Sequence, residues 1–188
     1  MQNTNKTILA YVSIIFSMIF WGISFVWTKE LLNANFPVFL ILTIRLAIAS
    51  LLMFTTFYLM GKLERIEKSD IPKFLLLTLF EPFLYFIGEN FSMHFVDASF
   101  AAIMIALLPI VNPIALHIFN KDKLGWNLLF GAVISVVGII IMSINPSGEL
   151  KISWQGTLLL LLAVVSGSGY GVILSRLINK YSPITITT

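Results

Sequence analysis

The sequence predicts an all-α integral membrane protein, and three observations support this fold class. Of the 188 residues, 58% are hydrophobic and 11% are charged, and the mean hydropathy is +0.94. This is more apolar surface than a water-soluble domain of this length can bury. The apolar residues gather in runs of about 20 residues, the length of one helical membrane span. These runs lack the alternating pattern of barrel strands, so they must satisfy their backbone groups as helices.

Six such runs follow one another, which predicts about six transmembrane helices. We expect the first to remain in the mature protein rather than to act as a signal peptide, because it is longer than a typical signal core and leads into WTKELL without a small-residue cleavage pattern. The second is interrupted by one arginine, the third contains two carboxylates, and the fourth ends in two prolines. The fifth and sixth follow short polar segments rich in Asn, Pro, Ser and Gly. The expected spans are 8–28, 37–60, 72–90, 99–119, 124–143 and 156–175.

Basic residues predict the orientation, because Lys and Arg collect on the cytoplasmic side of a membrane. With a cytoplasmic N-terminus, nine of them face the cytoplasm and two face outward, while Arg45 stays within the membrane. We therefore expect a multi-pass protein of the cytoplasmic membrane with its N-terminus inside. The nine are Lys6, Lys62, Arg65, Lys68, Lys73, Lys121, Lys123, Arg176 and Lys180, and the two are Lys29 and Lys151.

The first and sixth spans share a local pattern. WGISFVWTK (21–29) aligns with SGYGVILSR (168–176), which matches Gly22 with Gly169 and Lys29 with Arg176. The copies begin 147 residues apart (168 − 21) and five spans apart, so the second copy is inverted in the membrane. Inverted repeats build many secondary transporters around a site near the midplane. The chain is therefore expected to contain one repeat and the first helix of another.

Four stretches of the sequence carry short motifs that form a specific pattern when taken together. FWGISFVWTK (20–29) holds a Trp-Gly pair, and IRLAIASLLMF (44–54) has an arginine as its second residue. ENFSMHFVDASFAAIMIALLPIVNPI (89–114) places an Ala-Ser pair before a small-residue helix that ends in prolines, and LGWNLLFGAVISVVGIIIMS (124–143) is rich in glycine. Together they resemble the EamA-type branch of the drug/metabolite transporter superfamily. The resemblance implies a five-helix repeat at 1–150 and the first helix of a second, incomplete inverted repeat at 151–188.

The resemblance also implies a function and partners. We expect export or import of small metabolites or drugs through a central cavity, by alternating access driven by a gradient. The expected partners are a small-molecule substrate and the lipid bilayer, together with either a second copy of the chain or a missing C-terminal half. The alternative is a membrane scaffold without transport activity, or an inactive half-transporter.

Several function classes are not expected. The pI of 9.2 indicates contact with anionic lipid rather than nucleic acid. The sequence has no cysteine, two histidines, no HExxH pattern and no phosphate-binding glycine loop. We therefore expect no enzyme activity, no cofactor and no metal site.

Three charged residues, Arg45, Glu81 and Glu89, fall within the predicted spans away from their cytoplasmic ends. At 1.5 Å per residue they lie about 12, 16 and 5 Å below the outer edge of the hydrocarbon core. An unpaired charge in hydrocarbon costs at least about 3 kcal/mol, so we expect Arg45 to pair with Glu81, or Glu81 to be protonated. The group is either a polar cluster that binds substrate or ions, or a structural clamp. Glu89 is alternatively shallow enough to snorkel to the interface.

Other polar residues extend this candidate site. Tyr85 stands four residues from each carboxylate, so it shares one side of the helix with them. Trp21 lies at mid-depth, where an indole either lines a cavity or packs among helices. The candidate substrate- or ion-binding residues are Trp21, Arg45, Glu81, Tyr85, Glu89, Asn90 and Asn112.

Prolines and glycines predict hinges and close packing. Pro82 removes a backbone donor beside Glu81, and Pro109 and Pro113 do the same over one turn of the fourth span, which produces either a hinge or a fixed kink. Gly167 and Gly171 are four residues apart on the sixth span and let a neighbouring helix approach closely.

Overall fold

The computed structural model describes residues 2–121, 125–143 and 153–188. In these ranges the regular elements are all helical. Five stretches are long and apolar enough to cross a membrane, and a shorter apolar helix covers Trp126–Ser135. These findings confirm the predicted all-α membrane fold. The predicted domain boundary at 150/151 and the predicted start of the fifth span at Leu124 lie outside the described residues.

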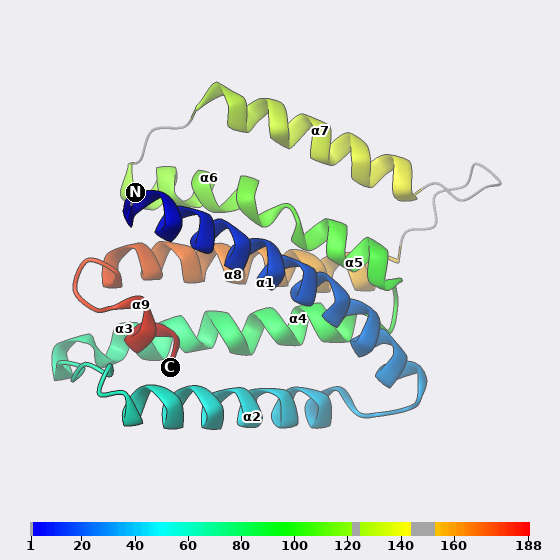
Figure 1. The fold of residues 1–188 in the computed structure, drawn as a ribbon. Helices are drawn as coiled ribbons and strands as arrows, with labels where there is room; N and C mark the ends of the chain where they lie inside the picture. The colour runs from blue at the N-terminus through cyan, green and yellow to red at the C-terminus, as the bar shows by residue number, and fades with distance from the viewer. Residues whose placement is uncertain (1, 122–124, 144–152) are drawn as a thin grey trace.

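The first two spans form an antiparallel pair (Figure 1). Helix α1 covers Gln2–Asn33, and helix α2 covers Val38–Leu59. Pro37 precedes α2 with extended backbone, so α2 begins one residue after the predicted start. Large apolar side chains remain exposed along both helices. Such a surface suits contact with lipid.

The third span is interrupted in its middle. After the short turn η1 (Lys68–Asp70), it consists of α3 (Ile71–Thr78), the wide turn η2 (Leu79–Leu84) and α4 (Tyr85–Ser92). Within η2, Glu81 has extended backbone, with φ −142° and ψ 123°. Pro82 explains the break, because proline has no N–H for the helix and disfavours helical backbone in the residue before it.

The fourth span is also broken, in the turn just before the first of its two prolines. Helix α5 covers Ala98–Ile105 and helix α6 covers Leu108–Asn120. The break falls just before Pro109, which stands in the first turn of α6, whereas Pro113 lies inside that helix. A proline is tolerated in the first turn, where its missing N–H would have no helical partner. The first proline therefore starts a new helix rather than bending an old one.

Helix α8 lies at the centre of the fold. The last elements are α7 (Trp126–Ser143), α8 (Trp154–Leu177) and the short α9 (Pro183–Thr187). In Figure 1, α8 runs between α6 on one side and α3 and α4 on the other, and it contacts all three as well as η2. Small residues make this possible: a Cβ added at Gly88 of α4 would lie 2.5 Å from the Leu159 carbonyl oxygen of α8.

Candidate functional site

The break at Glu81 opens onto a cavity. It measures about 370 Å³ and lies between α2, the interrupted third span, α8 and α9. The extended backbone at Glu81 places that carboxylate on the cavity wall with the Thr78 hydroxyl and Tyr170. We call it the Glu81 cavity. It is lined by Leu46, Ala49, Ser50, Met53, Leu77, Thr78, Glu81, Pro82, Phe86, Tyr170, Ile186, Thr187 and Thr188.

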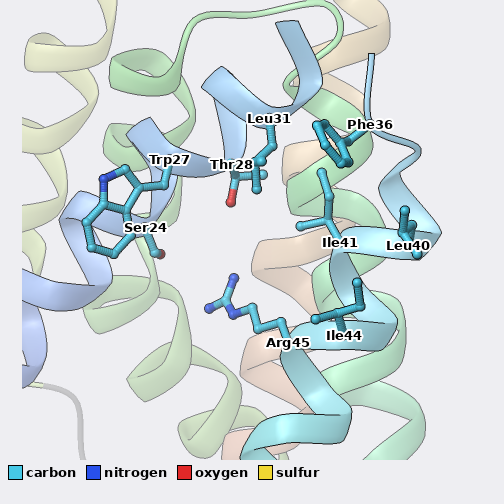
Figure 2. Close-up of a pocket in the computed structure, with 9 residues that line it drawn as sticks. All are labelled: Ser24, Trp27, Thr28, Leu31, Phe36, Leu40, Ile41, Ile44 and Arg45. Carbon is cyan, nitrogen blue, oxygen red and sulfur yellow. The ribbon is translucent and has the colours of Figure 1, made fainter. Parts of the chain in front are cut away.

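A second space lies between α1 and α2, with Arg45 at one end (Figure 2). It measures about 440 Å³. We call it the Arg45 groove. Its walls are Ser24, Trp27, Thr28, Leu31, Phe36, Leu40, Ile41, Ile44 and Arg45. Most of this lining is apolar, so the guanidinium is the dominant polar group in the groove.

Arg45 and Phe86 stand between the two spaces. The Arg45 guanidinium carbon lies 4.8 Å from the centroid of the Phe86 ring. Arg45 lines the groove, and Phe86 lines the cavity. This cation–π contact therefore joins one wall residue of the groove to one wall residue of the cavity.

The predicted ion pair between Arg45 and Glu81 is not formed. Within the described ranges, no carboxylate oxygen lies within 4.0 Å of the Arg45 guanidinium. The charge of Arg45 instead acts on Tyr85 and Glu89. The sequence placed these groups by depth alone, and depth says nothing about which side of a helix a residue occupies.

Glu89 is buried rather than turned toward the interface. It is 1% exposed, and the Tyr85 hydroxyl, one turn earlier, is the side-chain donor that acts on its carboxyl group. The two groups form no hydrogen bond of good geometry, with each other or with another described residue. A carboxyl and a hydroxyl that are buried and poorly satisfied are costly in a protein interior, and such groups are found where a ligand, an ion or a proton binds.

The remaining candidate residues are spread over the fold. Asn90 is fully buried and donates from its Nδ2 to the Phe86 carbonyl at 2.8 Å, which leaves its Oδ1 unpartnered. Asn112 projects from α6 against Gly171 of α8, and its Oδ1 is also unpartnered. Trp21 packs against the apolar core, 6.3 Å from the Phe25 ring centroid, and lines neither the groove nor the cavity.

The glycines of α8 lie where the broken helices cross it. A Cβ at Gly167 would meet Leu108, the first residue of α6, at 2.8 Å. A Cβ at Gly169 would meet the Phe80 ring in η2 at 2.9 Å. The breaks in the third and fourth spans therefore both rest on the same segment of α8.

A separate ionic cluster joins the loop after α2 to the segment after α8. Tyr181 donates its hydroxyl to Asp70 Oδ2 at 2.8 Å, and Lys180 Nζ lies 2.6 Å from both Asp70 Oδ2 and Glu67 Oε2. Hydrogen bonds to Asp70 and then Glu67 raise the pKa of Lys180 above its ordinary range. This Asp70 cluster was not predicted, because Asp70 and Lys180 are 110 residues apart.

Sequence reasoning also missed Phe86 and the polar residues of α1 that face the groove. Thr28 was noted only as part of the repeat, although its side chain lines the groove and is 5% exposed. Phe86 gives no signal of its own, because the chain contains 16 phenylalanines. Its proximity to Asn90 and Tyr85 is the one feature that could have drawn attention to it.

The long apolar helical spans define a multi-pass membrane protein. The chain belongs to the EamA-like transporter family, which matches residues 8–144. It is similar to an uncharacterized transporter of Archaeoglobus fulgidus, with 28% identity over 95% of this chain and 62% of the relative. It is also similar to the uncharacterized transporter YdfC of Bacillus subtilis, with 28% identity over 97% of this chain and 59% of the relative.

A third relative, the uncharacterized transporter YcxC of Bacillus subtilis, is 27% identical over 95% of this chain and 57% of its own length. The chain thus spans less than two thirds of the length of these curated relatives. No solved structure gives a significant match.

Proposed function

We propose that this chain is part or all of a secondary transporter that moves small metabolites or drugs across the cytoplasmic membrane by alternating access. The observation that supports this most strongly is the pair of spaces on either side of Arg45 and Phe86. The Arg45 groove lies along the N-terminal part of α2, which follows the loop from α1. The Glu81 cavity lies along the part of α2 that leads into the next loop. Two half-channels that share one boundary are what alternating access requires.

The proposed orientation would put the two spaces on different sides of the membrane. We infer that the N-terminus is cytoplasmic, from the excess of basic residues on that side. The Arg45 groove then opens toward the outside, and the Glu81 cavity toward the cytoplasm. A substrate would pass from one to the other by displacing the Arg45 and Phe86 side chains.

The broken helices supply the moving parts of the proposal. Discontinuous helices in transporters form binding sites and absorb conformational change. Here the breaks at Glu81 and before Pro109 both rest on glycines of α8, where small side chains let helices slide. Movement of α8 against them would open one space while closing the other.

Glu81 and Glu89 are the groups proposed to use a gradient. Both are carboxylates within a membrane span; Glu81 lines a cavity, and Glu89 is buried with the Tyr85 hydroxyl as its side-chain donor. A carboxylate in that setting gains stability by binding a proton or a cation. Exchange of that ion between the two sides would drive the substrate.

The experiment is a flux assay on the chain in liposomes with an imposed pH or sodium gradient. Uptake of an isotope-labelled pool of small metabolites is followed by mass spectrometry. Glu81→Gln and Arg45→Ala should abolish gradient-driven uptake without affecting membrane insertion. Glu30→Gln and Arg65→Ala, at exposed positions outside both spaces, are matched controls and should transport normally. Unchanged uptake in both site variants would reject the site assignment. Absence of uptake by the unmodified chain under every gradient would favour the scaffold.

A further inference from the structure

We propose that the Arg45 groove binds a small apolar carboxylate, with the carboxylate on the Arg45 guanidinium and the hydrocarbon part against the groove wall. The claim that such a carboxylate is a substrate rests on the proposed transport function. The claim that it binds rests on the groove itself.

Arg45 carries a positive charge that is not paired with a carboxylate of the described residues. Its guanidinium is half-buried within a membrane span, and one face lies on the Phe86 ring. Among the residues that the structure describes, none offers it a carboxylate within 4.0 Å. The cation–π contact uses a face of the guanidinium and leaves its N–H groups, which lie in the ring plane, able to bind a carboxylate with two parallel hydrogen bonds.

Two hydroxyl groups of α1, those of Ser24 and Thr28, line the groove together with Arg45 of α2. Figure 2 shows both hydroxyls on the side of α1 that faces the Arg45 guanidinium. Ser24 donates its proton to the Trp21 carbonyl at 2.6 Å. Within the described ranges the Thr28 hydroxyl makes no such bond, so it can donate to an anion in the groove. The polar end of the groove thus presents hydrogen-bond donors and a positive charge.

The rest of the groove is apolar. Beyond the polar end the walls are Leu31, Phe36, Leu40, Ile41 and Ile44, and the volume is about 440 Å³. Ligand pockets for single small molecules measure about 300–1,000 Å³. An anion such as inorganic phosphate would have to give up its hydration water to enter a mostly hydrocarbon groove, and a cation would be repelled by Arg45. A carboxylate with a hydrocarbon body matches both the polar end and the apolar walls of the groove.

The nearby ionisable groups do not replace this ligand. From α4, Tyr85 and Glu89 are within electrostatic reach of Arg45, and Glu81 of η2 in turn acts on both. Glu89 nevertheless forms no ion pair with Arg45, and the side-chain donor that acts on it is the Tyr85 hydroxyl. The direct contacts of the guanidinium on the groove side are therefore left to the ligand.

The test is a binding measurement by isothermal titration calorimetry on the chain in lipid nanodiscs. The probes are phenylacetate, its neutral amide phenylacetamide, and laurate as a fatty acid that partitions from the bilayer. Phenylacetate should bind, and phenylacetamide should bind about tenfold to a hundredfold more weakly because the charged hydrogen bonds are lost. Equal binding of the acid and the amide overturns the proposal. So does binding of laurate without phenylacetate, because the site then takes a membrane lipid.

Two variants locate the site. Arg45→Ala should weaken phenylacetate binding by the same factor as the change to the amide, while Arg65→Ala should leave it unchanged. Leu40→Trp keeps the charge and fills the groove, so it should also abolish binding, and it serves where Arg45→Ala fails to insert. Phenylacetate affinity that is the same in Leu40→Trp and the unmodified chain overturns the proposal. Binding without any flux would uphold this inference and reject the proposed function.

Discussion

The Arg45 guanidinium lies 4.8 Å from the centroid of the Phe86 ring, and these two side chains belong to different spaces of the molecule. Arg45 lines the groove between α1 and α2, and Phe86 lines the cavity that holds Glu81. A contact of this kind contributes about 0.5–2 kcal/mol, depending on its exposure to water. In the proposed transport cycle, this contact would keep the two spaces apart until a bound substrate displaces it.

Removal of the Phe86 ring should therefore uncouple the two spaces. In Phe86→Leu the cation–π contact is lost and a smaller side chain fills the boundary, so downhill leak should rise while gradient-driven accumulation falls. Phe86→Tyr keeps the ring and should accumulate substrate normally. Both are measured with the proteoliposome assay. Equal accumulation by the leucine variant and the unmodified chain would show that Phe86 is not a barrier.

Packing of α4 on α8 gives a stability prediction. Gly88→Ala would place a methyl group 2.5 Å from the Leu159 carbonyl oxygen and 2.9 Å from the Ala163 nitrogen. Since these are backbone atoms, the helices must separate, which should cost about 1–3 kcal/mol. Thermal unfolding in detergent should show a lower midpoint. Gly22→Ala meets nothing within 4 Å and is the matched control, expected to be neutral or slightly stabilising. If the two variants melt at the same temperature, this packing has been misjudged.

The Asp70 cluster gives a prediction for hydrogen exchange. Tyr181 accepts a hydrogen bond from the Glu67 backbone N–H at 3.1 Å, and Thr185 accepts one from the Glu64 N–H at 3.0 Å. Tyr181→Phe should speed exchange at the Glu67 amide, and Thr185→Val at the Glu64 amide, each with less effect on the other. Exchange that stays slow in both variants would mean that these loop contacts add no protection.

The same cluster has a defined pH dependence. The pKa of Lys180 is raised from its ordinary 10.5, so its contribution to stability is fully present below that value and is lost as the pH rises through the higher folded-state pKa. Protection of the Glu67 amide, corrected for intrinsic exchange, should therefore stay constant across neutral pH. A loss of that protection near neutral pH would contradict this assignment.

Orientation can be tested because the chain has no cysteine. Ala34→Cys lies between α1 and α2, and Ser69→Cys lies in the turn before α3. In intact cells a membrane-impermeant thiol reagent should label position 34 and not position 69. The opposite pattern would place the N-terminus outside, and labelling of both would indicate mixed orientation.

The spans and the break beside Pro82 could be predicted from the sequence because they depend on local properties. Hydrophobic length set the five long spans, and proline chemistry set the break at Glu81. The partner of Arg45 could not be predicted. Counting residues along a helix gives depth, which made Glu81 the nearest match, but the side of the helix decides contact. That side is set by how α2 packs on α4.

The central position of α8 was also beyond the sequence. Gly167 and Gly171 indicated close packing of some helix, and their spacing identified the face involved. Which helices arrive there depends on long-range assembly, and both broken spans do. The break before Pro109 shows a similar limit, because two prolines four residues apart leave open which one starts the new helix.

The most direct test of the account is whether the two spaces are reached from opposite sides of the membrane in alternation. Thr28→Cys reports on the Arg45 groove and Ser50→Cys on the Glu81 cavity. An impermeant thiol reagent should reach position 28 only from outside and position 50 only from the cytoplasmic side. An imposed gradient should raise one labelling rate while lowering the other. Labelling of both positions from one side, or rates that rise and fall together, would contradict alternating access.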